Sequence, residues 1–157
     1  MWVVSVVGRS GIIWLVVGVA LTLARRVQPS GLIQLALTIL LASLVTDRVL
    51  KPLIGRERPF VSTPDIRVIG GRPADASFPS GHAANAFAGS SALSRIVPGA
   101  RIVWWAMALT IAYSRVYLGV HYPLDVIGGA AMGWLCGLLL ERVLDRLRGW
   151  RAGPRAR

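Results

Sequence analysis

Cysteine, histidine and acidic residues are all scarce in this chain of 157 residues. The single cysteine, Cys136, excludes an intramolecular disulfide and argues against a metal cluster built on thiolates. Only two histidines are present, so any histidine chemistry must use His82 or His121. Seven acidic residues stand against 18 lysines and arginines, which gives a formal net charge of +11. These absences leave a strongly basic protein whose stability does not depend on disulfides.

A basic protein with 54% hydrophobic residues must separate the two kinds of side chain along its sequence. The arginines stand between apolar blocks, a pattern typical of membrane helices joined by basic loops. Nucleic-acid binding is the alternative that the positive charge suggests. Because the arginines do not follow one face, we expect no nucleic-acid partner. No cleavable signal peptide is expected either, since the first apolar block lacks a basic leader and a small-residue cleavage site before Arg25.

Five apolar blocks predict an all-α, polytopic membrane helix bundle with about five transmembrane helices. The blocks cover residues 2–24, 31–50, 83–97, 102–118 and 124–140. A span across the hydrocarbon core needs about 20 residues, and the third block is shorter and rich in alanine. We therefore expect it to be a central helix shielded by the others. The length suits one domain, which we place at residues 1–147, followed by a basic, disordered tail at 148–157.

Two further features of the apolar blocks bear on packing and orientation. Gly129, Gly133 and Gly137 recur every four residues, which predicts close approach of a second helix. Trp104 and Trp105 are expected at a membrane interface. With five crossings, one face holds ten of the 18 basic residues. The other face holds five once Lys51, Arg58 and Arg115, which have a chemical role, are set aside. That excess predicts a cytoplasmic face that includes the carboxyl terminus, and it turns the segment 51–82 outward.

Three polar clusters interrupt the apolar pattern, and the helix count places all three on one membrane face. The first cluster runs from Lys51 to Pro59, and the second runs from Pro79 to His82. The third consists of Ser114-Arg115, His121 and Asp125. Other basic residues at membrane edges usually serve as interfacial anchors, and this is the role expected for Arg56, Arg67 and Arg72.

These clusters resemble the signature of the type 2 phosphatidic acid phosphatase superfamily, which also includes vanadium-dependent haloperoxidases. The family pattern is Lys, six residues, Arg-Pro; then Pro-Ser-Gly-His; then Ser-Arg, five residues, His, three residues, Asp. Every named position is filled here, over about half of the chain, by Lys51, Arg58-Pro59, Pro79 to His82, Ser114-Arg115, His121 and Asp125. The resemblance, to the bacterial membrane branch, implies a metal-independent hydrolase of lipid phosphates or diphosphates.

The resemblance also implies which residues bind the phosphate, and their chemistry is consistent with that role. Lys51, Arg58 and Arg115 would supply donors to the phosphoryl oxygens, which a guanidinium fork fits well. Ser80 and Gly81 stand where the third helix is expected to begin. A helix amino terminus favours an anion, and Gly81 lets the backbone approach it closely.

The catalytic roles implied by the resemblance fall on the two histidines. His121 is expected to be the nucleophile that forms a transient phosphohistidine. Asp125, four residues later, is expected to accept a hydrogen bond from the second ring nitrogen of His121. His82 is then expected to be the general acid that protonates the leaving oxygen.

The expected partners are a lipid phosphate or pyrophosphate substrate and the bilayer, with the oligomeric state left open. No cofactor is expected, and a metal is disfavoured because two histidines and Asp125 are too few ligands beside so many cations. Undecaprenyl pyrophosphate, hydrolysed at the outer side of a bacterial plasma membrane, is the first candidate substrate. Phosphatidylglycerol phosphate, phosphatidic acid and a prenyl-linked sugar phosphate are alternatives. A vanadate-dependent haloperoxidase and a non-catalytic scaffold are the competing classes.

Overall fold

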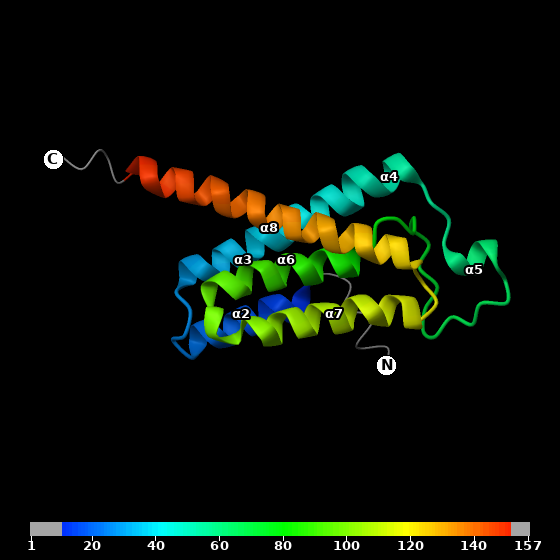
Figure 1. Ribbon diagram of the computed structural model, residues 1–157, viewed down its shortest axis with the longest axis horizontal. Helices are drawn as coiled ribbons and strands as arrows, with labels where there is room; N and C mark the ends of the chain where they lie inside the picture. The colour runs from blue at the N-terminus through cyan, green and yellow to red at the C-terminus, as the bar shows by residue number, and fades with distance from the viewer. Residues whose placement is uncertain (1–10, 152–157) are drawn as a thin grey trace.

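The computed structural model describes the backbone of residues 11–151 and the side chains of residues 11–147. Within this range the chain is all-α, as the apolar blocks predict, and contains no strand. The main helices run back and forth along the long axis of the molecule (Figure 1). In chain order the elements are α2 (Ile12–Leu23), α3 (Pro29–Ser43), η1 (Leu44–Leu50), α4 (Lys51–Ile54), α5 (Pro59–Ser62), α6 (Gly81–Ile96), η2 (Pro98–Ala100), α7 (Arg101–Tyr117) and α8 (Pro123–Arg151).

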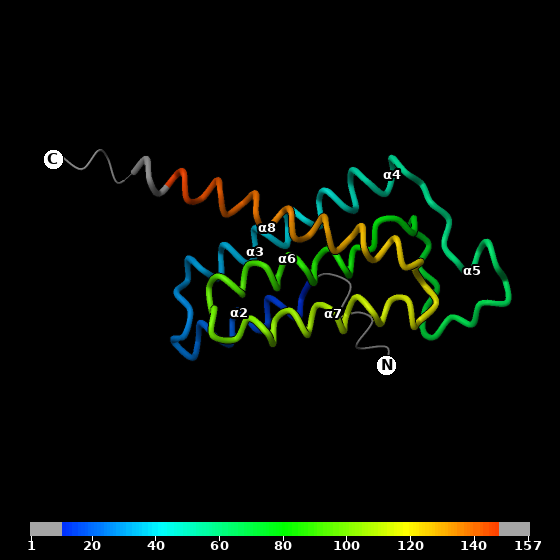
Figure 2. Tube along the Cα trace, viewed as in Figure 1, coloured from blue at the N-terminus to red at the C-terminus, as the bar shows by residue number. Residues whose placement is uncertain are grey.

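The second apolar block forms one continuous helical rod with an unusual middle. Its α3 begins with Pro29 in the first turn, where proline's missing N–H costs nothing. The segment η1 is a π-helix, and such wide turns are rare and often lie at functional sites. The rod then ends at Gly55, whose φ of +60° is readily adopted by glycine. The trace in Figure 2 shows the rod crossing α8, with which α3 is in contact.

The third block, α6, lies at the centre of the bundle, and the prediction of a shielded helix is confirmed. Most of its residues are buried, including the polar Asn85 and Ser90. It contacts α2, α3, α7 and α8 (Figure 1). The Asn85 carboxamide oxygen accepts a hydrogen bond of 2.9 Å from the Ser43 hydroxyl, which partly compensates for its burial.

Helix α8 packs on α6 through the predicted row of glycines, and this prediction is confirmed. A Cβ atom on Gly129 would collide with the carbonyl oxygen of Ser80, and one on Gly133 with that of Ala84. A Cβ atom on Gly137 would collide with the hydroxyl of Ser91. The absence of side chains at these positions therefore sets the distance between the two helices. α8 continues to Arg151, past the domain boundary expected at residue 147, and residues 152–157 lie outside the described range.

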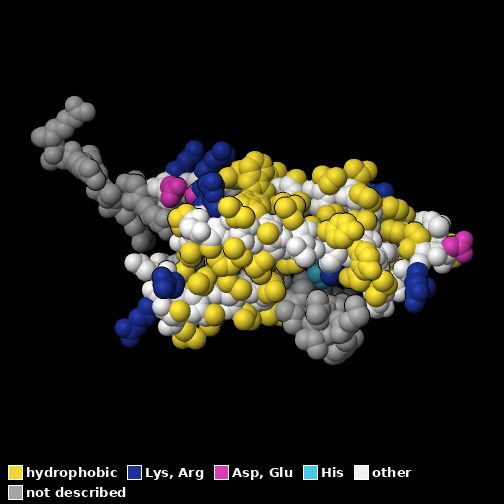
Figure 3. Space-filling view, turned by 60° about the horizontal axis from the view of Figure 1, so that its bottom comes forward, with side chains coloured by type: hydrophobic (Ala, Val, Ile, Leu, Met, Phe, Trp, Pro, Cys, Tyr) yellow, Lys and Arg dark blue, Asp and Glu magenta, His cyan; other side chains and the backbone are white. Residues whose placement is uncertain are grey.

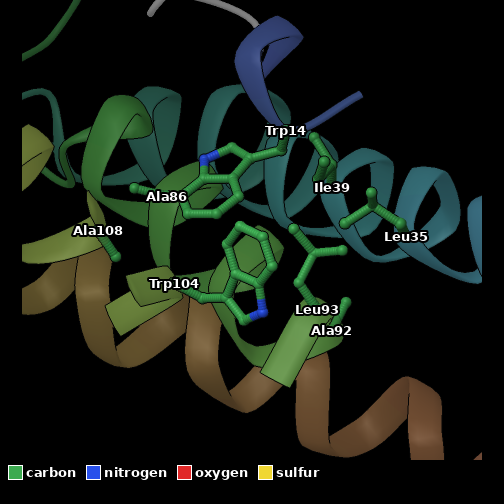
Figure 4. Packing of buried hydrophobic residues seen from close by; sticks show 8 residues of the cluster. All are labelled: Trp14, Leu35, Ile39, Ala86, Ala92, Leu93, Trp104 and Ala108. Carbon is green, nitrogen blue, oxygen red and sulfur yellow. The ribbon is translucent and has the colours of Figure 1, made fainter. Parts of the chain in front are cut away.

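A hydrophobic cluster joins α2, α3, α6 and α7. Figure 4 shows its buried members, among them Trp14 of α2, Leu93 of α6 and Trp104 of α7. Trp104 was expected at the membrane interface, and this prediction is wrong. Its side chain is only 8% exposed, and its indole N–H donates to the Val97 carbonyl at 3.2 Å.

The outer surface indicates a membrane protein, although helix length does not establish five spans. Two segments, Pro29–Ser62 and Pro123–Leu147, are long and apolar enough to cross a membrane. Helices α2, α6 and α7 have 12, 16 and 17 residues, fewer than the roughly 20 of a full span. Figure 3 shows hydrophobic side chains across the middle of one face and lysines and arginines toward its ends. This distribution fits an apolar belt between two interfaces.

Candidate active site

The three polar clusters come together at one end of the bundle. The first follows η1 and contains α4, the second leads into α6, and the third joins the end of α7 to the start of α8. All of these segments lie at the right-hand end of the molecule in Figure 1. The helical hairpins thus bring residues separated by more than 60 positions into hydrogen-bond contact, as Arg58 and His121 demonstrate.

Arg58 is the centre of this arrangement. Its guanidinium is buried and donates to four oxygens or nitrogens around it. Nη1 donates to the Val120 carbonyl at 2.8 Å and lies 3.3 Å from His121 Nε2. Nε donates to the backbone carbonyl of Asp75 at 2.8 Å, and Nη2 donates to the Asp75 carboxylate at 2.8 Å. A buried arginine held by this many acceptors has a fixed orientation.

The partners of His121 determine which ring nitrogen carries the proton. Arginine has donors only, so Nε2, 3.3 Å from Arg58, must be the acceptor with the free lone pair. Nδ1 then carries the hydrogen and lies 3.5 Å from the Ser77 hydroxyl. Burial and then the charge of Arg58 lower the pKa of His121 from 6.5 to about 4, against the opposing charge of Asp125. His121 is therefore neutral at physiological pH, with its lone pair directed toward Arg58.

Asp125 lies in the first turn of α8, is fully buried, and has partners on three sides. Its Oδ2 accepts hydrogen bonds from the Ser77 hydroxyl at 2.5 Å and from the Tyr122 N–H at 2.9 Å. Its Oδ1 accepts from Arg56 Nη1 at 2.9 Å. The expected direct hydrogen bond from His121 is not made, because Nδ1 and Oδ2 are 3.6 Å apart. Ser77, which contacts both residues, connects them instead.

Lys51 is the first residue of α4, and its side chain lies beside the amino terminus of α6. Its Nζ makes ion pairs of 2.6 Å with Asp47 and 2.6 Å with Asp75. A Cβ atom on Gly81 would lie 3.6 Å from Lys51 Nζ and 3.3 Å from Asp47 Oδ1, so glycine keeps this space open. Lys51, Arg58 and the first turn of α6 together make a positively polarised site that suits an anion.

The structure places the other predicted site residues at the same end without joining all of them to this network. Ser80 caps α6: its hydroxyl accepts from the Ala83 N–H, and its own N–H donates to the Asp125 carbonyl at 2.9 Å. His82 is the second residue of α6. Arg115 is buried in the last turn of α7, where its guanidinium donates to the Ser114 hydroxyl. Phosphate binding by Ser80, Gly81 and Arg115, and the acid role of His82, stay predictions.

Three residues of the network were missed or misjudged from the sequence. Arg56 was expected to be a membrane anchor, which is wrong, because it pairs with Asp125 and stacks 4.2 Å from the Tyr122 ring centroid. Asp75 and Ser77 lie in the segment between α5 and α6, which carries no periodic pattern. Their position just before the Pro-Ser-Gly-His cluster was the one available signal. From the sequence, the loop between Phe60 and Phe78 could hold a short interfacial helix or cover the site. In the structure it overlaps α5, and its residues Asp75 and Ser77 join the network.

The side chains gathered here favour anion binding over metal binding. Among residues 11–147, no group of three histidine, cysteine, aspartate or glutamate side chains is arranged to hold a metal ion. The carboxylates near His121 are already paired with Lys51, Arg56 or Arg58. What this arrangement can do chemically is bind an anion beside the lone pair of a neutral histidine.

Comparisons with family models and with known protein sequences agree on one protein family. A family model described as the PAP2 superfamily matches residues 31–148. The undecaprenyl-diphosphatase of Sulfolobus acidocaldarius is 32% identical over 133 residues, which cover 82% of this chain and 63% of that protein. The lipid A 4'-phosphatase of Bacteroides thetaiotaomicron is 35% identical over 131 residues, which cover 74% of this chain and 56% of that protein. The chain thus spans little more than half the length of these relatives.

A solved structure agrees with the family match. The crystal structure of Aquifex aeolicus LpxE superposes with a TM-score of 0.68 at 27% identity, covering 87% of this chain and 86% of that one. The family model covers well over half of the sequence and includes all three polar clusters. The resemblance inferred from those clusters is confirmed, and the chain belongs to the PAP2 superfamily.

Proposed function

We propose that this chain is a membrane-embedded hydrolase that removes phosphate from a lipid phosphate or pyrophosphate without a metal ion. The observation that carries the proposal is the orientation of His121. Its Nε2 lone pair is directed toward Arg58, and its Nδ1 side is directed toward Ser77 and Asp125. A phosphoryl group that binds Arg58 therefore lies beside a neutral nitrogen nucleophile.

The proposed reaction has two steps. The His121 Nε2 lone pair attacks phosphorus while the P–O bond to the lipid breaks and His82 gives its proton to the leaving oxygen. Water then attacks the phosphorus of the phosphohistidine, His82 takes a proton from that water, and the P–N bond breaks to restore His121. Lys51, Arg58 and Arg115 stabilise the charge on the equatorial oxygens throughout.

Asp125 has an electrostatic role in this scheme. His121 becomes positively charged when its Nε2 bonds to phosphorus, and the buried Asp125 carboxylate stabilises that charge through Ser77. The ion pair with Arg56 at 2.9 Å holds the Asp125 carboxylate in place before substrate binds.

The proposed substrate is undecaprenyl pyrophosphate, hydrolysed at the extracytoplasmic face of a bacterial plasma membrane as part of carrier-lipid recycling. Support comes from the related undecaprenyl-diphosphatase and from the excess of arginines at the opposite face. The membrane setting lets the prenyl chain stay in the bilayer while its diphosphate enters the pocket. Phosphatidylglycerol phosphate, phosphatidic acid and prenyl-linked sugar phosphates are alternatives, and the relative from Bacteroides adds lipid A phosphates.

Phosphate release by the detergent-purified chain, in the presence of EDTA, tests both the reaction and the substrate. We expect release from undecaprenyl pyrophosphate, more slowly from the other lipids of the panel, and at least about a thousandfold less from His121→Ala. Arg67→Ala, an exposed change at the same end of the bundle, is the matched control and should retain activity. Release that requires a divalent metal, or that persists in His121→Ala, would contradict the proposed mechanism. Activity that appears only with vanadate and peroxide would favour the haloperoxidase.

A further inference from the structure

The Asp75 carboxylate is held by Lys51 and Arg58, two of the three cations that the proposed function assigns to the substrate. Its Oδ2 lies 2.6 Å from Lys51 Nζ, and its Oδ1 lies 2.8 Å from Arg58 Nη2. Two oxygens of one anionic group thus bridge a lysine and an arginine, in the way that two oxygens of a phosphoryl group would.

The Asp75 side chain is much more exposed than the two cations that it contacts. The side chains of Lys51 and Arg58 are 12% and 5% exposed, whereas that of Asp75 is 48% exposed. The cations are therefore built into the bundle, and the carboxylate reaches them from its solvent-exposed side. Arg58 Nε also binds the backbone carbonyl of Asp75 at 2.8 Å. Rotation of the Asp75 side chain can free both cations from this carboxylate without breaking that backbone contact, and Lys51 then keeps its ion pair with Asp47.

The carboxylate is also fully ionised where it lies. Partial burial raises the pKa of Asp75, but the charges and hydrogen bonds of Lys51 and Arg58 outweigh this and lower it to about 2. At any physiological pH these two cations are thus already paired with an anion of the same chain. A phosphate dianion carries more charge and more acceptor oxygens than a carboxylate, so it can displace Asp75 from them.

We propose that Asp75 is an internal competitor for the phosphate pocket, which sets the affinity of the site for phosphoryl groups and speeds the departure of product phosphate. This inference rests on the proposed function of the same pocket. When phosphate binds Lys51 and Arg58, the Asp75 side chain turns out to solvent. When hydrolysis leaves inorganic phosphate in the pocket, the returning carboxylate replaces it. A lipid substrate also binds through its hydrocarbon chain. Its binding is therefore less sensitive to Asp75 than the binding of free phosphate.

The alternative to competition is a structural role for Asp75. Asp75 would then hold Lys51 and Arg58 in position, and its charge would help to create the anion site. The two roles predict changes of opposite sign when the charge is removed, because loss of a competitor tightens phosphate binding and loss of an organiser weakens it.

The test is the dissociation constant of inorganic phosphate, measured by titration calorimetry on the full chain in detergent, for wild type, Asp75→Asn and Asp75→Ala. We expect both variants to bind phosphate about tenfold more tightly, which corresponds to about 1.4 kcal/mol. Asp65→Asn, an exposed neutralisation in the same segment, is the matched control and should bind as wild type does. Unchanged or weaker binding in the folded Asp75 variants would overturn the proposal.

Lipid hydrolysis measured on the same preparations separates this inference from the proposed function. If wild type releases phosphate from lipid and the Asp75 variants do not bind phosphate more tightly, the competitor role is wrong and the function stands. Stronger inhibition of lipid hydrolysis by added phosphate in Asp75→Asn, with Asp65→Asn unchanged, would support the competitor role independently. If wild type neither hydrolyses lipid phosphates nor binds phosphate, both proposals fail.

Discussion

The Nδ1 atom of His121 lies 3.6 Å from the Oδ2 atom of Asp125, beyond the reach of a direct hydrogen bond. The Ser77 hydroxyl donates to that same oxygen at 2.5 Å and lies 3.5 Å from Nδ1. A hydroxyl can accept from one group while it donates to another, so Ser77 can carry the polarisation from the carboxylate to the ring. The connection from Asp125 to His121 therefore has three members, where the sequence motif names two.

Replacing Ser77 with alanine should slow catalysis without weakening substrate binding. We expect kcat for lipid hydrolysis to fall about 10- to 100-fold, the range typical when a partner that orients a functional histidine is lost. KM should change little, because Ser77 acts through His121 and Asp125. Ser77→Thr should restore part of the rate. Ser62→Ala, which removes an exposed hydroxyl bonded to Glu57, is the control; equal kcat for the two alanine variants would show that Ser77 does not couple His121 to Asp125.

The titration of His121 should occur well below that of an ordinary histidine. Because the chain has only two histidines, a His82→Asn variant labelled at histidine gives one imidazole signal by NMR. We expect its midpoint near pH 4, since burial and Arg58 lower the pKa of His121 to about 4. Arg58→Gln should move the midpoint upward by removing the positive charge. A midpoint near 6.5 with Arg58 intact would mean that the ring is solvated or that Asp125 dominates.

The same shift makes stability depend on pH in a defined window. The unfolded chain binds a proton at His121 near its ordinary pKa of 6.5, and the folded chain binds it only near pH 4. The folded state should therefore lose stability as pH falls from 6.5 toward 4. Thermal unfolding across this range should show a smaller loss in His121→Gln than in wild type. An equal loss in both would assign the pH dependence to other groups.

The order of the helices and the location of the pocket were predictable because both follow from local patterns. Apolar blocks separated by arginines mark where helices begin and end. The three polar clusters stand in the second and fourth connections between the blocks, and these alternate connections must share one end of such a bundle. The glycine row of α8 was equally readable, since small residues at four-residue spacing have few other uses in a membrane helix.

The connections within the pocket were not predictable in the same way. Asp75 and Ser77 stand in an irregular segment, and their partners Lys51, His121 and Asp125 are distant in the chain. Arg56 has the features of an interfacial arginine, and only its contacts with Asp125 and Tyr122 distinguish it from one. Trp104 likewise has the sequence features of an interface aromatic, yet tertiary packing buries it.

Arg56→Ala should therefore impair the enzyme, although an interfacial anchor would be dispensable. The change leaves the fully buried Asp125 carboxylate without its ion-pair partner, and we expect a cost of about 1–3 kcal/mol in unfolding free energy. We also expect kcat to fall about tenfold, because Asp125 is less firmly held. Arg56→Lys should recover part of both losses. Steady-state kinetics and thermal unfolding provide the measurements, with Arg67→Ala as the exposed control. Wild-type kinetics and stability in Arg56→Ala would show that Arg56 is an interfacial anchor.

Gly133→Ala should destabilise the bundle by forcing α8 away from α6. The added Cβ would meet the carbonyl oxygen of Ala84 and lie 2.9 Å from the Ala88 nitrogen, and backbone atoms cannot rotate aside. Overpacking of this kind costs about 1–3 kcal/mol, which exceeds the gain of up to about 1 kcal/mol from alanine's helix propensity. Activity should fall as well, since α8 carries Asp125, whose carbonyl binds the Ser80 N–H at 2.9 Å. Thermal unfolding in detergent measures the loss, and Gly99→Ala, with open space around its Cβ, is the control. A Gly133→Ala protein as stable as Gly99→Ala would contradict the close contact of α8 with α6 at Gly133.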